Sequence, residues 1–411
     1  MKLLLINHYA GSPKHGMEFR PFYLAREWVR TGHQALILGA SYSHVRTTQP
    51  EPGMAAMSGV NYLFYDTPEY RGNGMGRMKN IWSFCRQVWK DADILAREFA
   101  PDVVIASSTY PMDVWVARRV AKLAKAKLVY EVHDLWPLSP IELSGMSKWH
   151  PFAMLCQKAE NDAYRDADVV VSMLPKVHGH MAAHGLDLKK LNIVPNGITL
   201  DEWSEHGEPL DAAIQAHLDA ERAAGRTVVG YAGSMGEPNA LDVLLDAAKL
   251  LKDGHGGAAG AGLSFVLVGG GHLRERLEAR VRDEGLTNVA MFPAIPKAQI
   301  PSLLKGFDIA YIGWQRTPIY RFGIAPNKLM DYMMAQRPVL HSVEAGNDPV
   351  AEAGAGLTVP PQDPAAVADG LLKLAAVPAD ERAAMGRRGR EFVLANHTYP
   401  VLAQRFIDAV S

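Results

Sequence analysis

Short apolar runs alternate with longer amphipathic stretches along this chain, and most of the runs end at Gly, Asn, Ser or Asp. Such an alternation is typical of parallel strands joined by crossover helices, because strands that are buried on both faces are apolar throughout. In the first half of the chain it predicts helices at 19–31, 76–99 and 113–125, and strands at 3–7, 35–39, 61–66, 103–108, 127–132, 169–173 and 192–197.

A second series of apolar runs follows a polar, irregular break at 199–226 that contains an Ala-rich helical stretch. We therefore predict an α/β fold of two Rossmann-like, doubly wound domains that face each other across a cleft, with ligands at the carboxyl ends of the strands. The predicted domains are residues 1–198 and 199–395, and a last helix within 396–411 packs back on the first domain. The Gly- and Ala-rich run 255–263 is interpreted as a loop tip. The second series predicts strands at 228–233, 264–271, 289–294, 309–314, 338–343 and 356–361.

Length and composition agree with two domains in a soluble protein. The chain has 411 residues, of which 48% are hydrophobic, and a net charge of -1; this length is enough for two separate cores. The charge balance gives no reason to expect nucleic acid as a partner. Cys85 and Cys156 stand far apart without C-x-x-C spacing, so we expect reduced thiols in a cytoplasmic protein.

Any association with the inner membrane is expected to be peripheral. No stretch of the sequence reaches the roughly 18 apolar residues expected of a membrane-spanning helix. The N-terminal apolar run stops at Asn7-His8 and lacks the small-residue cleavage site of a signal peptide, so it is interpreted as the first strand. The tract 77–90 mixes cationic and aromatic side chains, which suits a helix at an anionic lipid surface and equally a helix packed on the first domain.

The stretch 320–334 joins an aromatic, Gly-containing loop to the start of a helix. Pro326 suits the first turn of that helix, and Lys328 then lies where free backbone N–H groups and the positive end of the helix dipole point. These features predict a phosphate or diphosphate site. Asp331 and Tyr332 follow on the same helix, where they can hold polar parts of a nucleotide-sugar.

Six segments of the sequence, taken in their order, resemble a known enzyme family. They resemble the retaining bacterial glycosyltransferases of family 4, which have the two-Rossmann-domain (GT-B) fold, and within them the branch that builds O-antigen and capsule, including N-acetyl-L-fucosamine transferases. The resemblance covers nearly the whole chain. The segments are Gly16 with its following helix and RTGHQALIL (30–38), EVHDLWPLSP (131–140), VPNGI (194–198), YAGSMG (231–236), VLVGGG (266–271) and FGIAPNKLMDYMMAQRPVL (322–340).

The resemblance implies an enzyme that transfers a sugar from a nucleotide-sugar, bound by the second domain, to an acceptor bound by the first. It implies retention of the anomeric configuration, no required metal and no cofactor beyond the nucleotide-sugar. Acceptors in this branch of the family are glycans or polyprenyl-diphosphate-linked glycans. A peripheral position at the membrane would fit such acceptors.

Two departures from the family pattern concern the donor site. The family's two donor glutamates, eight positions apart, fall here on Gly323 and Asp331, so the acid that would meet the transferred sugar is missing. This absence suggests a deoxy or N-acetylated sugar, and Asp331 is expected to accept hydrogen bonds from the ribose hydroxyls. The family's diphosphate-binding Arg and Lys fall on Ser234 and Asn239. We therefore expect Lys328 to stabilise the charge on the leaving diphosphate.

The other donor-site candidates are turn glycines, loop residues and cations, and each glycine alone is equally well explained as a strand-end turn. The segment 269–274 reads G-x-G-x-x-R, so it lacks the third glycine of a dinucleotide-binding fingerprint and is placed on the base side of the donor pocket. The candidate donor residues are Gly16, Gly233, Ser234, Gly236, Gly269, Gly271, Arg274, Pro293, Ala294, Arg321, Gly323, Ala325, Pro326, Asn327, Lys328 and Asp331.

His133 and Asp134 follow the predicted strand 127–132, where a doubly wound fold places its chemistry. By resemblance, His133 contacts the transferred sugar and Asp134 orients it or handles the acceptor proton; with Lys328 they are the predicted catalytic residues. His15 and Arg20 are candidate acceptor or phosphate contacts. No residue stands out as a protein nucleophile, so we expect same-face attack in which the donor phosphate takes the acceptor proton.

Three further features are given structural interpretations. The two D-x-D triplets, 91–93 and 166–168, resemble metal-holding pairs of a different glycosyltransferase fold, but neither follows the carboxyl end of a strand, so they are interpreted as solvated acids. Glu160 and the pair Asn196-Gly197 match family positions and are interpreted as turn and interdomain structure.

The sequence as a whole predicts a glycosyltransferase that uses a nucleotide-sugar, with UDP and an N-acetylamino or deoxy sugar as the expected donor, in surface polysaccharide biosynthesis. A UDP-sugar 2-epimerase on the same fold is one alternative; it needs several acids and histidines around the sugar carbon, where only His133 and Asp134 are expected. A non-catalytic nucleotide-sugar-binding protein is the other alternative, because of the glycine at position 323.

Overall fold

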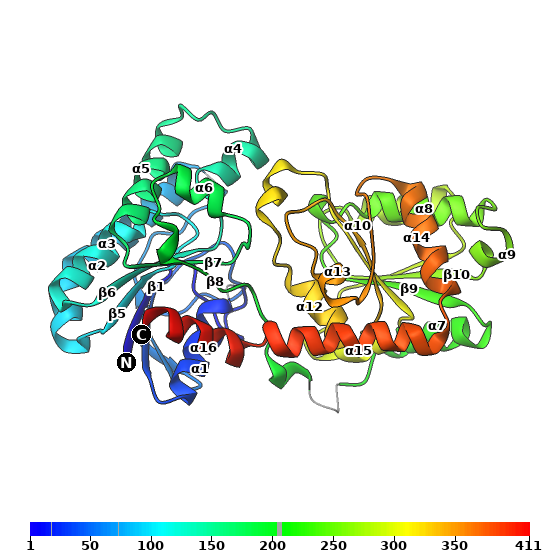
Figure 1. Cartoon of the computed structure of the whole chain (residues 1–411), viewed down its shortest axis with the longest axis horizontal. Helices are drawn as coiled ribbons and strands as arrows, with labels where there is room; N and C mark the ends of the chain where they lie inside the picture. Colours follow the sequence, from blue (N-terminus) through cyan, green and yellow to red (C-terminus); the bar gives the residue numbers. More distant parts are fainter. Residues whose placement is uncertain (18, 73, 204–207) are drawn as a thin grey trace. The chain divides into compact units, whose positions relative to one another are not determined.

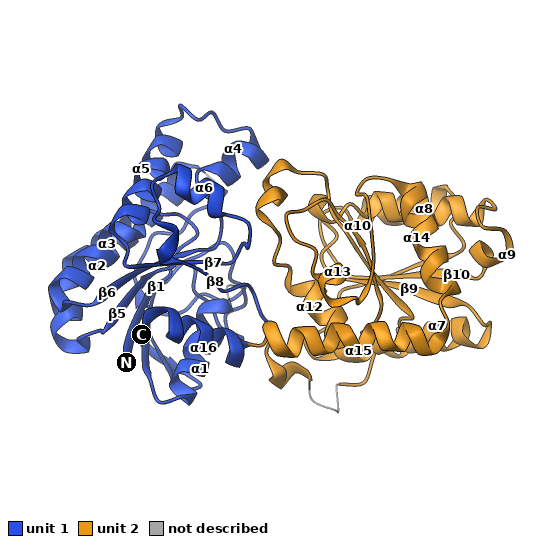
Figure 2. Cartoon of the chain, viewed as in Figure 1, with its two compact units in different colours: residues 1–197, 399–411 blue, residues 198–398 orange. Residues whose placement is uncertain are grey.

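The two predicted series of strands form two separate sheets in the computed structural model (Figure 1). The structure describes residues 1–17, 19–72, 74–203 and 208–411, so residues 204–207 of the predicted interdomain break lie outside the described ranges. Residues 1–197 together with 399–411 make one unit, and residues 198–398 make the second (Figure 2). The predicted class, α/β with two Rossmann-like domains, is confirmed.

Within the described ranges, the first unit contains a sheet in the order β3-β4-β2-β1-β5-β6-β7-β8, parallel except for the β3–β4 pair. Its strands are β1 Lys2–Ile6, β2 Gln34–Ala40, β3 Gly53–Met57, β4 Val60–Tyr65, β5 Val103–Ala106, β6 Lys127–Val132, β7 Val169–Ser172 and β8 Leu191–Ile193. Its helices are α1 Arg20–Arg30, α2 Met75–Ile94, α3 Asp113–Ala124, α4 Leu138–Ser144, α5 Pro151–Asp166, α6 His178–Ala183 and α16 Tyr399–Val410.

The second unit contains a fully parallel sheet in the order β11-β10-β9-β12-β13-β14. Its strands are β9 Thr227–Ala232, β10 Leu263–Val268, β11 Val289–Phe292, β12 Ile309–Gly313, β13 Val339–Ser342 and β14 Gly356–Val359. Its helices are α7 Ala212–Ala223, α8 Leu241–Lys252, α9 Gly257–Ala261, α10 Arg274–Asp283, α11 Ile300–Lys305, α12 Asn327–Met334, α13 Pro349–Ala353, α14 Pro364–Ala376 and α15 Ala379–Asn396.

The edge strand β3 is not predicted by the apolar pattern. It pairs antiparallel with β4 through a turn at Ser58 and Gly59, whose φ angles of 50° and 80° are those of a tight two-residue hairpin. Its sequence, GMAAM, is rich in Gly and Ala, and alternate residues are exposed. Such a strand lacks the branched and aromatic residues on which a sequence-based prediction depends.

The interpretation of 255–263 as a loop tip is wrong, because residues Gly257–Ala261 form the short helix α9. At Gly260 an added Cβ would lie 2.2 Å from the carbonyl oxygen of His255. The glycines therefore permit close backbone packing in this segment. The Gly- and Ala-rich composition alone does not distinguish such a helix from a loop.

The last helix, α16, packs within the first unit against α1, as Figure 1 shows. The Trp28 and Phe406 rings lie 5.1 Å apart between centroids, and the Trp28 indole N–H donates to the carbonyl of Ala403 at 3.2 Å. Tyr23 and Tyr399 form a second ring pair at 4.8 Å. Aromatic pairs of this kind add to the burial of apolar area that holds the helix in place.

In each sheet the strand order reverses beside the strand that begins the series. In the first sheet β1 lies between β2 and β5, and in the second β9 lies between β10 and β12. Open parallel sheets bind their ligands outside the carboxyl ends of the strands at such a reversal. As for the membrane, no helix in the described part of the chain combines the length and the apolar character needed to cross a bilayer.

Candidate functional site

Lys328 lies at the strand reversal of the second sheet, in the first turn of α12. Its ammonium group donates to the hydroxyl oxygen of Tyr231 at 2.8 Å and to Oδ1 of Asn239 at 2.7 Å. Tyr231 and Asn239 both donate in turn to the carbonyl oxygen of Ser234, at 2.5 and 2.9 Å. An ammonium has three N–H groups, so this network fixes the position of the cation and leaves one donor for a ligand.

The loops after β9 and β10 are packed against each other through glycine. Gly233 has a φ of +152°, and a Cβ there would lie 2.7 Å from Cε of Lys328. A Cβ at Gly269 would lie 1.9 Å from the carbonyl oxygen of Gly233. The N–H of Met235 donates to the carbonyl of Gly270 at 2.7 Å and joins the two loops. Close backbone approach therefore requires glycine at position 269. Positions 233 and 271 favour glycine because their φ angles of +152° and +144° are rarely adopted by L side chains.

Gly236 differs from these glycines, because its φ of −127° is an ordinary extended conformation. An added Cβ would make only a tight contact, 3.4 Å from Cε1 of the exposed His272. The geometry at this position does not require glycine.

Burial lowers the pKa of Lys328 to about 7. The cause is loss of solvation, since the Tyr231 hydroxyl and the Asn239 amide oxygen that replace water carry no formal negative charge. A cation held in this way gains more from an anionic ligand than an exposed lysine does, because the ligand restores the stabilisation that burial removed.

Asp331 lies three residues after Lys328 on α12, so the two side chains share one face of the helix. Burial raises the pKa of Asp331 to about 7, and the charge of Lys297 and a hydrogen bond from the Trp203 side chain oppose that rise. Lys297 itself is paired with Glu202 at 2.6 Å. The helix begins at Asn327 with Pro326 as its N-cap in an extended conformation, which corrects the placement of Pro326 in the first turn.

Gly323 ends a short 3₁₀ turn, Pro318–Phe322, and has a φ of +99°. A glutamate, as the family pattern has at this position, would have to adopt a backbone conformation that L-residues rarely tolerate. The loop that follows is fixed by Asn347, which accepts from the N–H of Ile324 at 2.7 Å and donates to its carbonyl at 3.1 Å. Glycine at position 323 thus permits a backbone conformation that a glutamate would rarely adopt.

The two donor-site arginines are engaged within the second unit. Arg274 pairs with Glu278 at 2.6 Å and donates to the carbonyl of Gly269 at 3.2 Å, so it also supports the loop after β10. Arg321 is exposed; its guanidinium donates to the carbonyl of Pro318 at 2.7 Å and lies over the ring of Phe322. Of the remaining candidates, Pro293, Ala294 and Asn327 are exposed, and Ala325 and Pro326 are half-buried.

In the first unit, His133 belongs to a buried polar cluster at the carboxyl ends of β5 and β6. Ser107 donates to Oε2 of Glu131 at 2.6 Å, and its Oγ lies 3.0 Å from Nε2 of His133. Because the Ser107 proton is used toward Glu131, Nε2 of a neutral His133 carries the ring proton and Nδ1 carries the lone pair. A histidine held in this way can accept a hydrogen bond from a hydroxyl through Nδ1.

Glu131 stays ionised although it is fully buried. Burial alone would raise its pKa, but the charge of Arg20 and hydrogen bonds from His133 and Ser107 outweigh burial and hold the pKa well below the usual range. Arg20 forms an ion pair with Glu131 at 2.9 Å and donates to the carbonyls of Val194 and Pro195. The structure therefore gives Arg20, with a side chain only 4% exposed, an internal role in place of the predicted acceptor contact.

Three other predicted residues lie at the surface or in the loop after β1. Asp134 is exposed beside His133. His15 is buried; its Nδ1 lies 3.0 Å from the hydroxyl of Ser12, and burial lowers its pKa. Gly16 has a φ of +85°, and a Cβ there would lie 2.7 Å from Oγ1 of Thr47. The structure thus places His15 and Gly16 in a folded loop rather than at an open surface.

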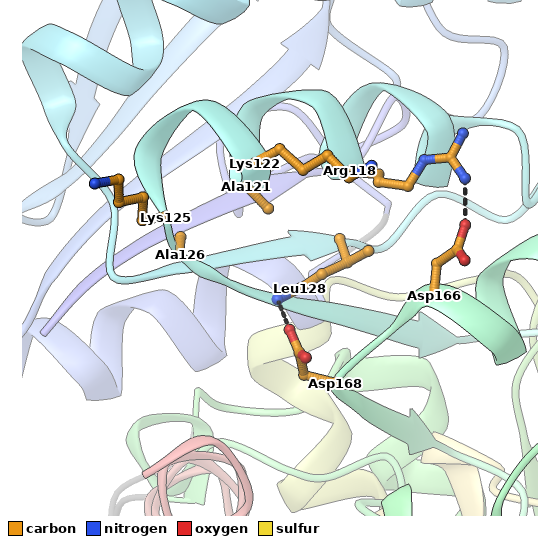
Figure 3. Close-up of a pocket in the computed structure, with 8 residues that line it drawn as sticks. All are labelled: Arg118, Ala121, Lys122, Lys125, Ala126, Leu128, Asp166 and Asp168. Carbon is orange, nitrogen blue, oxygen red and sulfur yellow. Dashed lines mark hydrogen bonds and ion pairs between the residues drawn. The ribbon is translucent and has the colours of Figure 1, made fainter.

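A pocket of about 440 Å³ lies at the opposite, amino ends of β6 and β7 (Figure 3). It contains the D-x-D triplet 166–168, but the two carboxylates are used separately. Asp166 pairs with Arg118, and Asp168 accepts from the N–H of Leu128 at 2.8 Å. In the other triplet Asp93 pairs with Arg119. Neither triplet presents a pair of free carboxylates to a metal.

Two family models match the chain. The model described as "Glycosyl transferase 4-like domain" matches residues 15–197, and the model described as "Glycosyl transferases group 1" matches residues 226–376. The first match lies within the first unit and the second match within the second unit. Together the two matches cover most of the chain. Its two domains belong to these glycosyl transferase families, and its fold is GT-B.

Individual relatives are distant. The chain is 23% identical over 251 residues to the putative colanic acid biosynthesis glycosyl transferase WcaI of Escherichia coli K12; the match covers 61% of this chain and 59% of that protein. Sucrose-phosphate synthase from Thermosynechococcus elongatus has a similar structure, with a TM-score of 0.72 at 16% identity, covering 99% of this chain and 98% of the other. Anabaena Alr3699/HepE in complex with UDP-glucose gives a TM-score of 0.64 at 15% identity over 99% and 98%.

Proposed function

We propose that this glycosyltransferase uses a UDP-sugar donor, bound by the second unit, to extend a glycan or polyprenyl-diphosphate-linked glycan of a bacterial surface polysaccharide. The observation that carries the proposal is the Lys328–Tyr231–Asn239 network, which holds a half-buried cation beside the glycine loops at the strand reversal. Two comparisons support the choice of donor and pathway: Alr3699/HepE is in complex with UDP-glucose, and WcaI is described as a colanic acid enzyme.

In the proposed reaction, the bond between the anomeric carbon and the diphosphate breaks as a bond to the acceptor oxygen forms on the same face of the sugar. The acceptor proton passes to the leaving diphosphate, so the configuration is retained and no metal is needed. Lys328 stabilises the negative charge that develops on the diphosphate, and Asp331 accepts from the ribose hydroxyls. Because Gly323 offers no carboxylate, we propose a deoxy or N-acetylated sugar, as in the N-acetyl-L-fucosamine transferases.

This function is tested by incubating the protein with a panel of UDP- and dTDP-sugars, with and without a lipid-linked acceptor, and measuring nucleotide release and the anomeric configuration of the product. The proposal predicts acceptor-dependent release of UDP from a deoxy or N-acetylated donor, in the presence of EDTA, with retention. Epimerised donor, or tight donor binding without turnover on any acceptor, would favour one of the two alternatives instead.

Donor binding is expected to consume a proton above neutral pH and to weaken as the pH rises through about 7. The pKa of Lys328 is about 7 in the free protein; a diphosphate favours the charged form, so the pKa rises in the complex and a proton is taken up. Calorimetric titration of a UDP-sugar above neutral pH, in two buffers of different ionisation enthalpy, measures this uptake.

A control must distinguish proton uptake by Lys328 from a change in the protonation of Asp331, because the pKa of Asp331 is also about 7. Lys328→Met should abolish the proton uptake attributed to the lysine, whereas Asp331→Asn should leave it in place. Uptake that survives in Lys328→Met and disappears in Asp331→Asn would assign the titration to the carboxyl group and contradict the proposed role of Lys328.

His133→Ala is expected to lower kcat by about 10 to 100-fold while UDP affinity changes by less than about twofold. The reason is that His133, held through Nε2 by Ser107, is proposed to contact the transferred sugar rather than the nucleotide. Steady-state kinetics together with UDP titration measure the two effects. An unchanged kcat would mean that His133 only supports the structure of the cluster around Glu131.

We also propose that α2 of the first unit touches anionic lipid. The helix buries Phe84 in the unit but leaves Trp82 and Trp89 63% and 44% exposed, and Arg86 and Arg119 lie over their rings. The tryptophans border an apolar groove of about 350 Å³. Such an aromatic and cationic surface suits a headgroup region. Co-sedimentation with anionic vesicles should fall in Trp82→Ser/Trp89→Ser, and equal sedimentation of the variant would contradict the proposal.

A further inference from the structure

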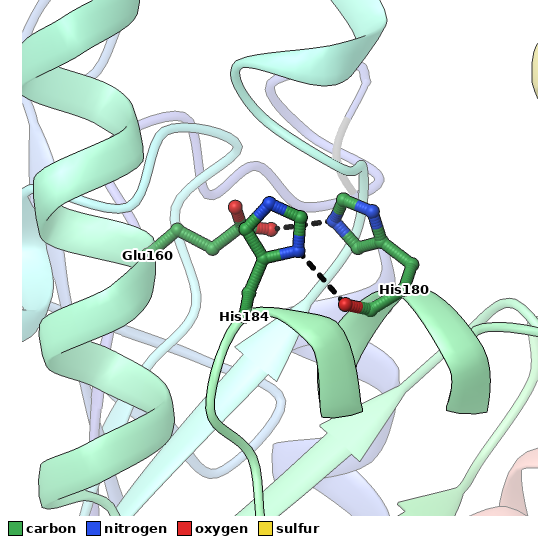
Figure 4. A group of neighbouring side chains, drawn as sticks. All are labelled: Glu160, His180 and His184. Atoms are coloured by element: carbon green, nitrogen blue, oxygen red, sulfur yellow. Dashed lines mark hydrogen bonds and ion pairs between the residues drawn. The ribbon is translucent and has the colours of Figure 1, made fainter.

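Three side chains of metal-ligating type meet in the first unit, and none of them belongs to the cluster around His133. Glu160 comes from α5, and His180 and His184 come from α6 and its C-terminal cap. One ligand atom from each lies within 4.8 Å of the other two. Figure 4 shows both imidazole rings beside the Glu160 carboxylate. This cluster is used by no step of the proposed transfer reaction.

The hydrogen bonds prepare His184 as a ligand. Its Nδ1 lies 2.8 Å from the carbonyl oxygen of His180, and since a carbonyl can only accept, Nδ1 carries the ring proton. Nε2 of a neutral His184 therefore carries the lone pair. A ring N–H donated to a backbone carbonyl is the arrangement that orients histidine ligands in metal sites.

The distances suit a zinc ion after a small closure of the cluster. Nε2 of His180 lies 3.1 Å from Oε1 of Glu160. Two ligands of one tetrahedral zinc, each about 2.1 Å from the metal, lie about 3.4 Å apart. The ligand atoms of the three residues now lie within 4.8 Å of one another. His184 is half-buried at the end of a short helix, so its ring can move closer to the other two ligands.

The Glu160 carboxylate is buried and oriented by hydrogen bonds, as metal ligands usually are. It is 1% exposed, and it accepts from the hydroxyl of Tyr164 at 2.9 Å and the amide of Gln157 at 2.7 Å. Both donors are neutral, and they orient the carboxylate as outer-shell partners do in metal sites. A buried carboxylate is stabilised best by a nearby positive charge. A divalent cation would supply that charge.

We propose that Glu160, His180 and His184 bind one Zn²⁺ ion, with water as the fourth ligand. Binding requires His180 to move its ring proton from Nε2 to Nδ1, so that both histidines offer Nε2 lone pairs. The ion would fasten α6 to α5 and hold the turn 173–177 after β7. The site is structural and shares no residue with the donor and catalytic candidates, so the metal-free chemistry proposed for sugar transfer does not depend on it.

The test is titration of EDTA-treated, dialysed full-length protein with Zn²⁺ by calorimetry and with Co²⁺ by visible absorption. We expect one ion per chain, tetrahedral Co²⁺ bands, and a higher Tm when zinc is added. His184→Ala should weaken zinc binding by at least about tenfold and lose the Tm increase. The matched control is His178→Ala, an exposed histidine on the same helix, which should bind zinc like the native protein.

Equal zinc affinity in His184→Ala and the native protein, or an absence of binding at micromolar zinc, would overturn the site. Transfer activity is a separate readout. Activity that persists in EDTA while the zinc-dependent rise in Tm disappears is the expected result, and loss of donor turnover with intact zinc binding would contradict only the proposed function.

Discussion

Lys328→Ala is expected to lower kcat/KM for sugar transfer by about 10² to 10³-fold, which corresponds to about 2.7–4 kcal/mol of transition-state stabilisation. The positions that supply cations to the diphosphate in the family are Ser234 and Asn239 in this chain. Asn239 accepts from Lys328 at 2.7 Å, so it positions the one cation rather than replacing it. Initial rates of UDP release measure the effect.

Two variants sharpen this prediction. Lys328→Arg should restore little activity, because a planar guanidinium cannot take the place of a compact ammonium between the Tyr231 hydroxyl and the Asn239 amide. Lys305→Ala, which removes an exposed lysine of the same unit, is the matched control and should keep its activity. A loss below about tenfold in Lys328→Ala, or about 1.4 kcal/mol, would mean that another residue carries the diphosphate charge.

Arg20→Ala is expected to destabilise the first unit by about 3–5 kcal/mol, because removing one partner of a buried ion pair leaves an uncompensated charge. Glu131 is fully buried and ionised, and Arg20 supplies the charge that keeps it so. The variant also loses the hydrogen bonds to the carbonyls of Val194 and Pro195. Urea unfolding combined with amide exchange in β6 reports on this unit separately from the second.

The controls distinguish the loss of a carboxylate's cationic partner from the loss of one partner of two. Arg30→Ala removes a side chain that is 52% exposed, and its partner Glu27 keeps its ion pair with Arg26, so the change should cost less than about 1 kcal/mol. Arg20→Met/Glu131→Gln removes both charges and should recover part of the lost stability. Because the pKa of Glu131 is lowered, its contribution is present above the usual pKa of 4.5 and is lost as the pH falls below it. Equal stability of Arg20→Ala and Arg30→Ala would contradict the account.

The fold could be predicted from the sequence wherever a strand is buried on both faces. The run KLVYEV gives β6 with the bounds that the structure has, since five of its six residues are buried. The edge strand β3 could not be found in this way, because its Gly- and Ala-rich sequence is half exposed and its pairing depends on the Ser58–Gly59 turn. The helix α9 could not be predicted either, because its sequence is rich in Gly and Ala. At Gly260 the glycine allows a close approach to the backbone of His255.

The candidate site could be predicted only in part. Lys328 and His133 could be named from local sequence and family resemblance, but the groups that hold them are distant in sequence. Tyr231 lies 97 positions from Lys328, and Glu131 lies 111 positions from Arg20. No periodicity encodes such contacts. The role of Arg20 cannot be predicted from the sequence for this reason, because only the folded chain brings it to the buried carboxylate of Glu131.

The most direct test of the central claim is a crystal structure of the protein in complex with UDP. The account predicts that a diphosphate oxygen lies within hydrogen-bond distance of Nζ of Lys328, beside the Gly233 loop, with Asp331 on the ribose hydroxyls. A diphosphate bound elsewhere, with the Lys328 ammonium still bonded only to Tyr231 and Asn239, would contradict it.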